Sequence, residues 1–511
     1  MADDSNERSL PKTVLVFILK ILWNVFVILT PILGFWLASS LSTFFNGSMW
    51  LPYLAQFAAF PLLPMVWETV AQWHFNQKVE EAEQAGDDEI PERILTFWDR
   101  FILRTLAVNL VFLTALAGWY PQKSFAALST RGDWMLEGQE GEWVQPTRDA
   151  LFETANMLEW LYEATRENPF EKYAEDEDRD VPTPEPNESD STDSDDRAEE
   201  ETDSEDTGSS DDESDDEPVS PDRPDWPPPD RLHPAVASIP ESAESSIESV
   251  AKYIDRKEDD PYQTVKAIYD WTADNIAYDA KALAAGKYPP QDAETVFETK
   301  MAVCAGYSKL MKAFGEELGI KVVYVTGDSR ERDGSISGSG HAWNAIRVGE
   351  KWFLADVTWG AGYVNGTTFH KRYEPNYLFT PPKLFSIDHF PDDENWQLRE
   401  DPISRGEFMR QPMLKPSFYV HGFELEKPTR SQVTVYDDIE IKLDNPKGHF
   451  AMARLERKGG KRRKRCRTQT GDPFVITCSV DSPGTYYVSL LGSADRRSTY
   501  WSMGRIEFHR R

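Results

Sequence analysis

Three long apolar stretches lie near the start of the chain, and they predict helices that enter a membrane. They cover Val14–Leu41, Trp50–Val70 and Phe101–Tyr120. About 20 apolar residues suffice for a helix to cross a bilayer, so the first and third stretches predict spans. The second stretch contains three prolines, Pro52, Pro61 and Pro64, and either spans with kinks or re-enters. We therefore expect residues 1–125 to form a membrane anchor with two or three transmembrane helices.

The Lys and Arg residues that flank these stretches predict an orientation, because such residues favour the cytoplasmic side. If all three stretches span, one side carries Arg8, Lys12, Lys78, Arg93 and Arg100, and the other carries Lys123 and Arg131. This bias places the N-terminus in the cytoplasm. The protein is then an integral membrane protein with extracytoplasmic soluble domains. The orientation reverses if the second stretch does not span.

A short amphipathic stretch and a long polar segment follow the anchor. Leu151, Ala155, Leu158 and Tyr162 share one face of a helix from about Thr147 to Arg166. This pattern predicts a juxtamembrane packing helix within residues 126–170. Residues 171–237 are rich in Asp, Glu, Ser and Thr and then in Pro. Such a segment buries too little apolar surface to offset its ordering entropy, so we expect a disordered, extended acidic linker.

Residues 238–400 change from helical to strand-like periodicity, which predicts an α+β domain. One helix is expected near Glu241–Lys257, and a second begins at Asp260-Pro261, where Asp260 caps, Pro261 takes the first helical position and Gln263 completes a capping box. A third runs from Cys304 to Leu318 and stops at Gly319. Strands are expected at Lys321–Thr326, His341–Val348 and Lys351–Trp359, with a turn at Gly349-Glu350 between the last two.

The last part of the chain, residues 401–511, shows short alternating runs separated by turn residues. These runs are Ser431–Val435, Ile439–Leu443, Phe474–Val480 and Thr485–Leu491. Their alternation predicts an all-β sandwich. The expected fold is therefore multidomain: transmembrane helices, a disordered linker, an α+β domain and a β-sandwich.

The formal net charge of −32 belongs mainly to one segment. From Glu171 to Glu217 there are 24 Asp and Glu against three Lys and Arg, whereas from Asp401 onwards there are 21 Lys and Arg against 13 Asp and Glu. A strongly negative protein repels phosphates, so we expect no nucleic-acid binding. The basic run 457–467 is either an exposed hairpin loop or a contact for an anionic partner, such as a polymer, lipid headgroups or the acidic linker itself.

The chain has three cysteines, which is too few for a disulfide scaffold and lacks the spaced pairs of a structural zinc site. Cys466 and Cys478 lie close together in the β region. They form a bridge if that domain faces an oxidising compartment, or remain two unpaired strand cysteines. Cys304 stands apart at a predicted helix start, where the helix dipole favours the nucleophilic thiolate and free backbone N–H groups can stabilise an oxyanion.

The two strands after Cys304 bring a histidine and an aspartate together. If the turn centres between Gly349 and Glu350, opposed residues have numbers that sum to 699, so His341 and Asp356 are diagonal neighbours on one face. Diagonal neighbours lie roughly 7–8 Å apart at the backbone, which lets a carboxylate reach an imidazole. Asp356 can then orient His341, which faces Cys304. A register slip of one residue would separate them.

The order and context of these residues resemble the transglutaminase-like superfamily, which has a papain-like thiol-enzyme core. The matching segments are Ala302–Tyr307, His341–Asn344 and Asp356–Trp359, with a similar lead-in helix at Ile268–Asp279. Tyr377–Pro382, His389–Pro391 and Trp396–Leu398 are similar to the kyphoscoliosis peptidase branch. The resemblance covers about Ser249 to Leu398.

The resemblance implies a catalytic triad in which Cys304 is the nucleophile, His341 the general base and acid, and Asp356 the orienting carboxylate. It implies action on a protein or peptide substrate through an acyl-thioenzyme, by peptide hydrolysis, glutamine transamidation or deamidation, with hydrolysis slightly favoured. It implies neither a metal nor another cofactor. The alternative is a non-catalytic envelope scaffold that uses the same fold to bind a partner. His370 and His389 lack ligand spacing and are expected to be packing or surface residues.

Overall fold

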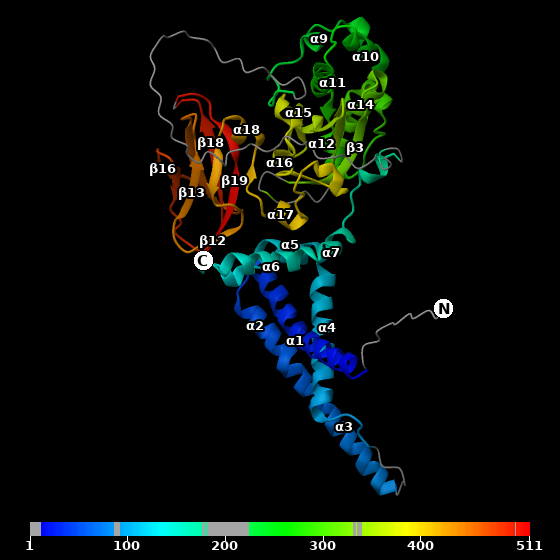
Figure 1. Ribbon diagram of the computed structural model, residues 1–511, viewed down its shortest axis with the longest axis vertical. Helices are drawn as coiled ribbons and strands as arrows, with labels where there is room; N and C mark the ends of the chain where they lie inside the picture. Colours follow the sequence, from blue (N-terminus) through cyan, green and yellow to red (C-terminus); the bar gives the residue numbers. More distant parts are fainter. Residues whose placement is uncertain are drawn as a thin grey trace, which may run out of the picture.

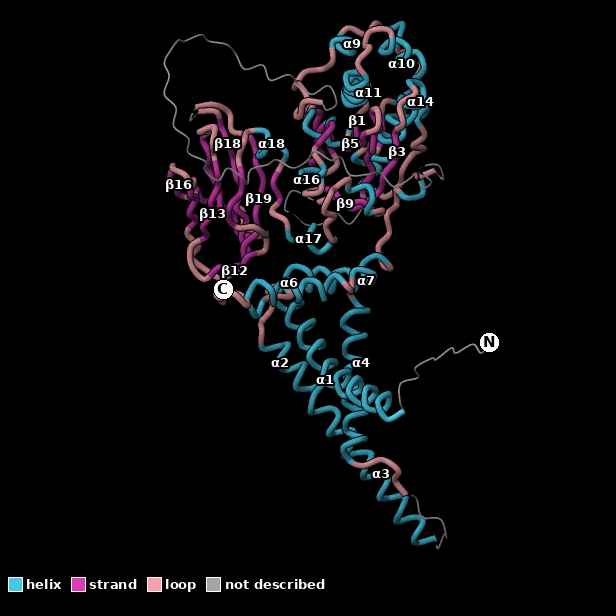
Figure 2. Tube along the Cα trace, in the orientation of Figure 1, coloured by secondary structure: helices cyan, strands magenta, loops and turns pink. Residues whose placement is uncertain are grey.

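The computed structural model describes residues 12–85, 92–175, 178, 181, 224–330, 334, 340–495 and 497–511. Long helices lie at one end of the molecule, and an α+β part and a β-rich part lie side by side at the other (Figures 1 and 2). Short helices form a layer between the two ends. The predicted acidic linker falls mostly at 182–223, outside the described residues.

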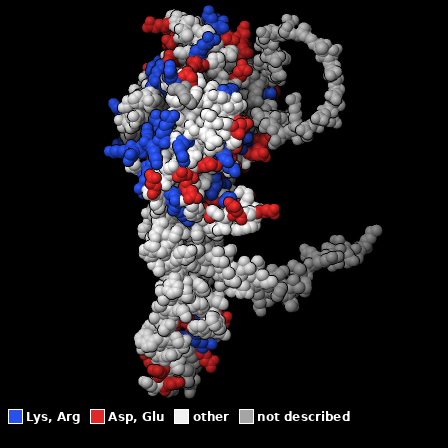
Figure 3. All heavy atoms as spheres, turned by 90° about the vertical axis from the view of Figure 1, so that its left-hand side faces the viewer, with Lys and Arg blue, Asp and Glu red and all other residues white. Residues whose placement is uncertain are grey.

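Three helices are long and apolar enough to cross a membrane, at Ile21–Phe44, Trp50–Ala85 and Phe97–Trp119. The elements are α1 (Lys12–Phe44), α2 (Trp50–Phe57), η1 (Ala58–Leu62), α3 (Leu63–Ala85) and α4 (Phe97–Trp119). Large apolar side chains on them stay exposed, such as Ile28 at 63% and Val111 at 70%. Figure 3 shows few charged side chains over the middle of these helices. A lipid environment would cover this surface.

The second apolar stretch forms two helical segments that are separated by a kink. Phe60 leaves the helical region, with φ −156° and ψ 123°, directly before Pro61. Proline lacks an N–H and disfavours the helical conformation of the preceding residue, which explains the kink. Beyond it, the buried Glu68 of α3 pairs with Arg100, with Nη2 to Oε1 at 2.8 Å, and also with Arg104 of α4. These pairs tie α3 to α4.

A layer of short helices separates the apolar helices from the rest (Figure 1). It comprises α5 (Pro121–Arg131), η2 (Trp134–Leu136), α6 (Val144–Asn156) and α7 (Glu159–Glu163), followed by η3 (Glu171–Tyr173). The prediction of one amphipathic helix from Thr147 to Arg166 is thus wrong. The chain turns between Asn156 and Glu159, so two helices, α6 and α7, take its place. Arg131 and Asp133 join the layer to the C-terminal part through Thr434 and Arg430.

The α+β part surrounds one antiparallel sheet in the order β8-β5-β4-β3-β9. Its strands are β3 (Val322–Ser329), β4 (His341–Val348), β5 (Lys351–Ala355), β8 (Leu378–Thr380) and β9 (His389–Pro391). The larger helices are α10 (Ile247–Asp255), α11 (Pro261–Asn275), α13 (Ala293–Thr299) and α14 (Cys304–Leu318). The smaller elements are α9 (Pro234–Ala237), η4 (Glu241–Ala243), β1 (Ala277–Tyr278), α12 (Ala280–Ala285), β2 (Met301–Ala302), α15 (Val357–Ala361), β6 (Gly362–Asn365), β7 (Thr368–Lys371), η5 (Pro375–Tyr377), α16 (Pro382–Phe385) and η6 (Glu394–Gln397).

Helix α14 packs against this sheet because its apolar stripe is continuous with the core. Tyr307, Leu310 and Phe314 are fully buried with Trp271 of α11 and Ile346 of β4. Helix α11 begins as expected, with Asp260 Oδ1 accepting hydrogen bonds from the N–H groups of Tyr262 and Gln263 at 2.8 and 2.9 Å. The sheet and α14 therefore form a rigid frame around the residue at the start of α14.

Three expectations about this region need correction. The helix expected near Glu241–Lys257 is split into η4 and α10. The strand expected to reach Trp359 ends at Ala355, where Asp356 caps the short helix α15. The linker expected to reach residue 237 is shorter at that end, since Trp226 donates to the Asn376 carbonyl at 3.2 Å and the His233 N–H donates to Asp270 at 2.6 Å.

The C-terminal part is β-rich, with two sheets that enclose one core. One sheet has the order β10-β19-β18-β14-β15, with β12 also on β19, and the other has the order β11-β13-β17-β16. The elements are α17 (Arg405–Arg410), β10 (Met413–Leu414), α18 (Pro416–Val420), β11 (Glu424–Lys427), β12 (Val433–Val435), β13 (Ile439–Asp444), β14 (Phe450–Arg457), β15 (Arg463–Arg465), β16 (Arg467–Gln469), β17 (Phe474–Cys478), β18 (Gly484–Ser493) and β19 (Trp501–Arg510).

The question left open for Cys466 and Cys478 has an answer in this core. Their Cα atoms are 4.5 Å apart and the sulfurs are bonded as a disulfide. Cys304 is the free cysteine of the chain, and it is buried.

Candidate active site

Cys304 occupies the first turn of α14, after Val303, whose extended backbone has φ −94° and ψ 179°. The Gln291 side chain holds this junction, because its Oε1 accepts the Val303 N–H at 2.9 Å. The thiol side chain is 1% exposed and lies in a cluster with Phe170, Tyr324 and Ala342. The chain thus places its free cysteine at a helix N-terminus, as the sequence pattern predicts.

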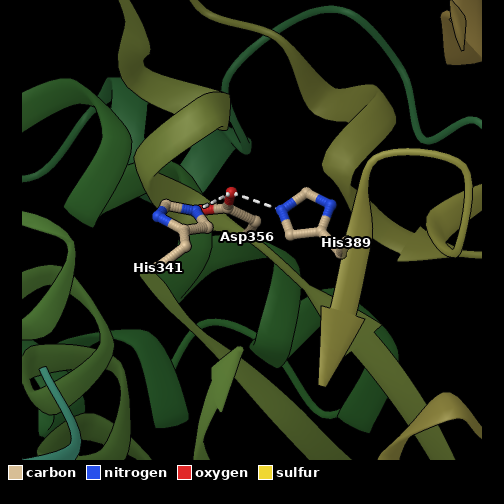
Figure 4. Close-up of side chains that lie close together, drawn as sticks. All are labelled: His341, Asp356 and His389. Carbon is tan, nitrogen blue, oxygen red and sulfur yellow. Dashed lines mark hydrogen bonds and ion pairs between the residues drawn. The ribbon is translucent and has the colours of Figure 1, made fainter. Parts of the chain in front are cut away.

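His341 and Asp356 come from two neighbouring strands with the predicted register. Asn344 pairs with Ala355 and Val348 with Lys351, so opposed residues sum to 699. His341 Nε2 lies 2.8 Å from Asp356 Oδ2, and both side chains are buried (Figure 4). The diagonal contact expected from the turn position is therefore present.

The other oxygen of Asp356 is fixed by the backbone. Asp356 Oδ1 accepts hydrogen bonds from the N–H groups of Thr358 at 2.9 Å and Trp359 at 3.2 Å. These are the free N–H groups of the first turn of α15, which a carboxylate at the N-cap satisfies. The end of β5 and the start of α15 therefore orient the carboxylate toward His341.

His389 joins this group, and the expectation that it is a packing or surface residue is wrong. Its Nε2 lies 3.0 Å from Asp356 Oδ2, and its Nδ1 lies 2.7 Å from Asp388 Oδ1. Tyr377 donates its hydroxyl to Asp388 Oδ2 at 2.9 Å. Figure 4 shows the Asp356 carboxylate between the two imidazole rings. A buried chain of polar groups thus continues behind Asp356.

The charges of these groups support one another. Burial lowers the pKa of the His341 imidazole, but the charge of Asp356 and hydrogen bonds to Asp356 and Cys304 raise it to about 9. Burial likewise lowers the pKa of His389, and Asp388 and Asp356 raise it to about 9. Burial raises the pKa of the Asp356 carboxyl, but the two imidazoles hold it well below its usual range. The contacts therefore favour the charged form of each group: the carboxylate of Asp356 and the imidazolium forms of His341 and His389.

The roles of the two ring nitrogens of His341 follow from these contacts. Nε2 contacts Asp356 Oδ2 at 2.8 Å, which leaves Nδ1 as the other ring nitrogen. The Cys304 side chain is among the groups that raise the pKa of His341. The fold thus joins His341 to Asp356 from two separate segments, and Cys304 acts on the pKa of the same imidazole.

Aromatic side chains surround the site. Trp343 and Trp359 both pack beside His341, with ring centroids 6.0 and 5.6 Å from the imidazole. His370 stacks on Tyr363 in the β6–β7 hairpin, 5.1 Å between centroids. His341, Asp356 and His389 offer possible metal-ligand atoms within 4.8 Å of one another. Hydrogen bonds between the rings and the carboxylate already account for this geometry.

Comparison with known proteins shows which family this domain resembles. Residues 248–357 match the sequence model of the Transglutaminase-like superfamily. The chain therefore carries a domain of the transglutaminase-like superfamily. Among curated proteins it is 34% identical over 178 residues to "Kyphoscoliosis peptidase" of Mus musculus, covering 34% of this chain and 27% of that protein.

Two further relatives and one solved structure also align with only part of the chain. The Homo sapiens "Kyphoscoliosis peptidase" is 31% identical over 199 residues, 38% of this chain and 30% of that protein. "Hillarin" of Drosophila melanogaster is 24% identical over 164 residues, 30% of this chain and 19% of that protein. A solved structure described as "Crystal structure of a TGase" has 22% identity and a TM-score of 0.20, over 26% of this chain and 36% of that one. The chain spans less than a third of its curated relatives.

Proposed function

We propose that this protein is a membrane-anchored transglutaminase-like cysteine enzyme that acts on peptide or glutamine amide bonds. The observation that carries the proposal is the contact between His341 and Asp356 at 2.8 Å, behind a cysteine at a helix N-terminus. A lone buried cysteine is usually structural. A cysteine with an oriented, charged imidazole has the components of a nucleophile and a proton donor.

The chemistry follows from these roles. The Cys304 thiolate attacks the carbonyl carbon of an amide, and the carbonyl electron pair moves to oxygen. The first turn of a helix leaves N–H groups without intrahelical partners, and in this proposal those at the start of α14 stabilise the oxyanion. The His341 imidazolium gives its proton to the leaving nitrogen, the C–N bond breaks, and an acyl-thioenzyme remains. Neutral His341 then takes a proton from the incoming nucleophile.

The nucleophile that opens the acyl-thioenzyme decides the product. Water gives peptide hydrolysis or deamidation, and an amine gives transamidation. We favour the peptidase because two curated relatives, at 34% and 31% identity, carry that word in their names. Both reactions use the same three side chains.

We further propose that three spans anchor the protein and that the soluble domains face an oxidising, extracytoplasmic compartment. The loop after α1 lies against the C-terminal part, since Asn46 donates to Thr485 Oγ1 at 2.7 Å. The end of α4 leads directly into α5 below the soluble domains. The Cys466–Cys478 disulfide fits such a compartment. Protease digestion of sealed vesicles tests this orientation: the soluble domains are cut only from the extracytoplasmic side.

One observation favours the scaffold alternative. Cys304 is 1% exposed, so the sulfur is covered in this conformation. A non-catalytic domain would keep the same buried contacts and would bind a partner without turnover.

Incubation of the full chain with a labelled primary amine and a protein mixture tests the proposal. Mass spectrometry then separates cleaved chains from amine-modified ones. Wild-type protein is expected to produce one of these products and Cys304→Ala to produce neither. If wild-type and Cys304→Ala samples are indistinguishable, the domain is a scaffold.

A further inference from the structure

A cavity of about 610 Å³ lies where the transglutaminase-like domain meets the β-rich part. His341, Thr358 and Trp359 line it on one side. Arg454, Ser489 and Arg505 line it on the other. This size suits a ligand of a few residues, and the cavity contains the imidazole of the proposed triad. Whatever occupies the cavity therefore contacts both parts of the protein.

The β-rich wall of the cavity is the outer face of the sheet β10-β19-β18-β14-β15. Along β14, Ala451, Ala453 and Leu455 point into the core, so Arg454 and Glu456 point outward. Arg454 pairs across with Arg465 of β15 and with Ser489 of β18. Ser489 in turn pairs with Arg505 of β19. One row of this face thus reads Arg465, Arg454, Ser489, Arg505.

This row holds more positive charge than the sheet itself neutralises. Arg454 and Arg465 are directly opposite, an arrangement that is unfavourable for like charges. Arg454 is exposed, and no carboxylate pairs with it in the described part of the chain. Glu456 is shared between Arg463, at 2.9 Å, and Arg505, at 3.9 Å.

The positive charge continues along the edge of this sheet. Among the described residues that line the cavity from the β-rich part, Arg454, Arg463 and Arg505 share one carboxylate, Glu456. All three residues of β15 are exposed, and one of them, Arg463, lines the cavity. Surfaces of this kind attract anions and bind carboxylates through charge-assisted hydrogen bonds.

We propose that the cavity binds an acidic segment of a polypeptide, whose carboxylates pair with Arg454, Arg463 and Arg505 while an adjacent amide reaches His341. This inference rests on the proposed function, because it names the substrate class of the same site. A polypeptide suits the site better than a nucleic acid, since the chemistry at Cys304 acts on amides.

Binding to full-length Cys304→Ala protein tests the proposal without turnover. The probe is a fluorescent peptide of alternating Glu and Gln, compared with a Lys-Gln peptide and a single-stranded oligonucleotide of equal charge. We expect the Glu-Gln peptide to bind to this protein. A double variant that combines Arg454→Glu with Arg505→Gln should weaken binding by more than about tenfold. Arg454→Glu also removes the Arg454–Arg465 repulsion, so this variant is expected to unfold at an equal or higher temperature than the parent.

Arg467→Glu is the matched control, because Arg467 is exposed on the neighbouring sheet but does not line the cavity. It should leave peptide binding within about twofold. Equal weakening by Arg467→Glu, or tighter binding of the oligonucleotide than of the peptide, would overturn the proposal. A second background replaces residues 182–223 with a Gly-Ser sequence and so removes competing carboxylates of the chain itself. No peptide binding in either background would also overturn it.

The two proposals fail separately. If the peptide binds to the cavity but wild-type and Cys304→Ala samples remain indistinguishable on the protein mixture, the acidic site stands and the enzyme proposal fails. If the wild-type protein turns over proteins but the arginine variants bind the peptide as the parent does, the enzyme stands and the acidic site fails.

Discussion

His341 and His389 contact the same oxygen of Asp356, at 2.8 and 3.0 Å, from two different strands. One carboxylate oxygen therefore orients the imidazole beside Cys304 and is itself held by a second imidazole. Asp388 and Tyr377 extend this arrangement on the other side of His389. We regard His389 as a positioning residue that acts through Asp356.

Asp356→Asn is expected to lower turnover by about 10²–10⁴-fold, because it removes the negative charge that raises the pKa of His341. His341 would then be neutral at pH 7 and could not give a proton to the leaving nitrogen. The measurement is kcat/KM on a peptide found to be a substrate. Asp274→Asn, at an exposed Asp paired with Lys371, is the control and should retain full activity. Equal activity of both variants would exclude a role for Asp356.

His389→Leu is expected to move the acid limb of the activity profile to higher pH. His389 lowers the pKa of the Asp356 carboxyl, so Asp356 gains a proton at a higher pH when that imidazole is absent. His389→Gln keeps a side-chain N–H near the position of Nε2 and should recover part of the shift. Identical pH profiles for the wild type and both variants would mean that His389 only fills space.

Gly306→Ala is expected to destabilise the start of α14 by about 1–3 kcal/mol. The new Cβ would lie 2.6 Å from Gln291 Oε1 and 2.7 Å from Val296 Cγ2. Gln291 holds the Val303 N–H, so Cys304 would shift as well. Thermal unfolding and alkylation of Cys304 measure the two effects. Gly118→Ala, where the added Cβ meets nothing within 4 Å, should show neither.

Removal of the disulfide by Cys466→Ser with Cys478→Ser should destabilise the β-rich part by about 3 kcal/mol, as estimated for the closure of a short loop. The two cysteines are 12 residues apart in the chain. Denaturant unfolding of the full chain in detergent, with and without reductant, measures this difference. A wild-type protein that titrates as three free thiols would contradict the bridge.

The sequence predicts an element well when residues close together in the chain determine it. The hairpin register follows from one turn, Gly349-Glu350, and it brings His341 to Asp356 as expected. The strand expected to continue to Trp359 is wrong because the side chain of Asp356 caps a new helix, which a strand-like residue pattern does not reveal.

The role of His389 is not predictable in this way. It lies 33 residues beyond Asp356, and it reaches the site only because β9 pairs with β3, with His389 opposite Ser329. Such a pairing depends on tertiary packing and leaves no spacing in the sequence. The signal that pointed to this segment was the similarity of His389–Pro391 to the kyphoscoliosis peptidase branch.

Alkylation of Cys304 by iodoacetamide as a function of pH tests the central claim most directly. Cys304 is the free cysteine, so the label reports on this thiol alone. If a charged His341 pairs with the sulfur, the rate at pH 6 should stay within about tenfold of the rate at pH 8.5, while in His341→Ala it should be about 100-fold lower at pH 6. If the alkylation rate of the wild-type protein depends on pH in the same way as that of His341→Ala, the result would contradict the proposed pairing of Cys304 with His341.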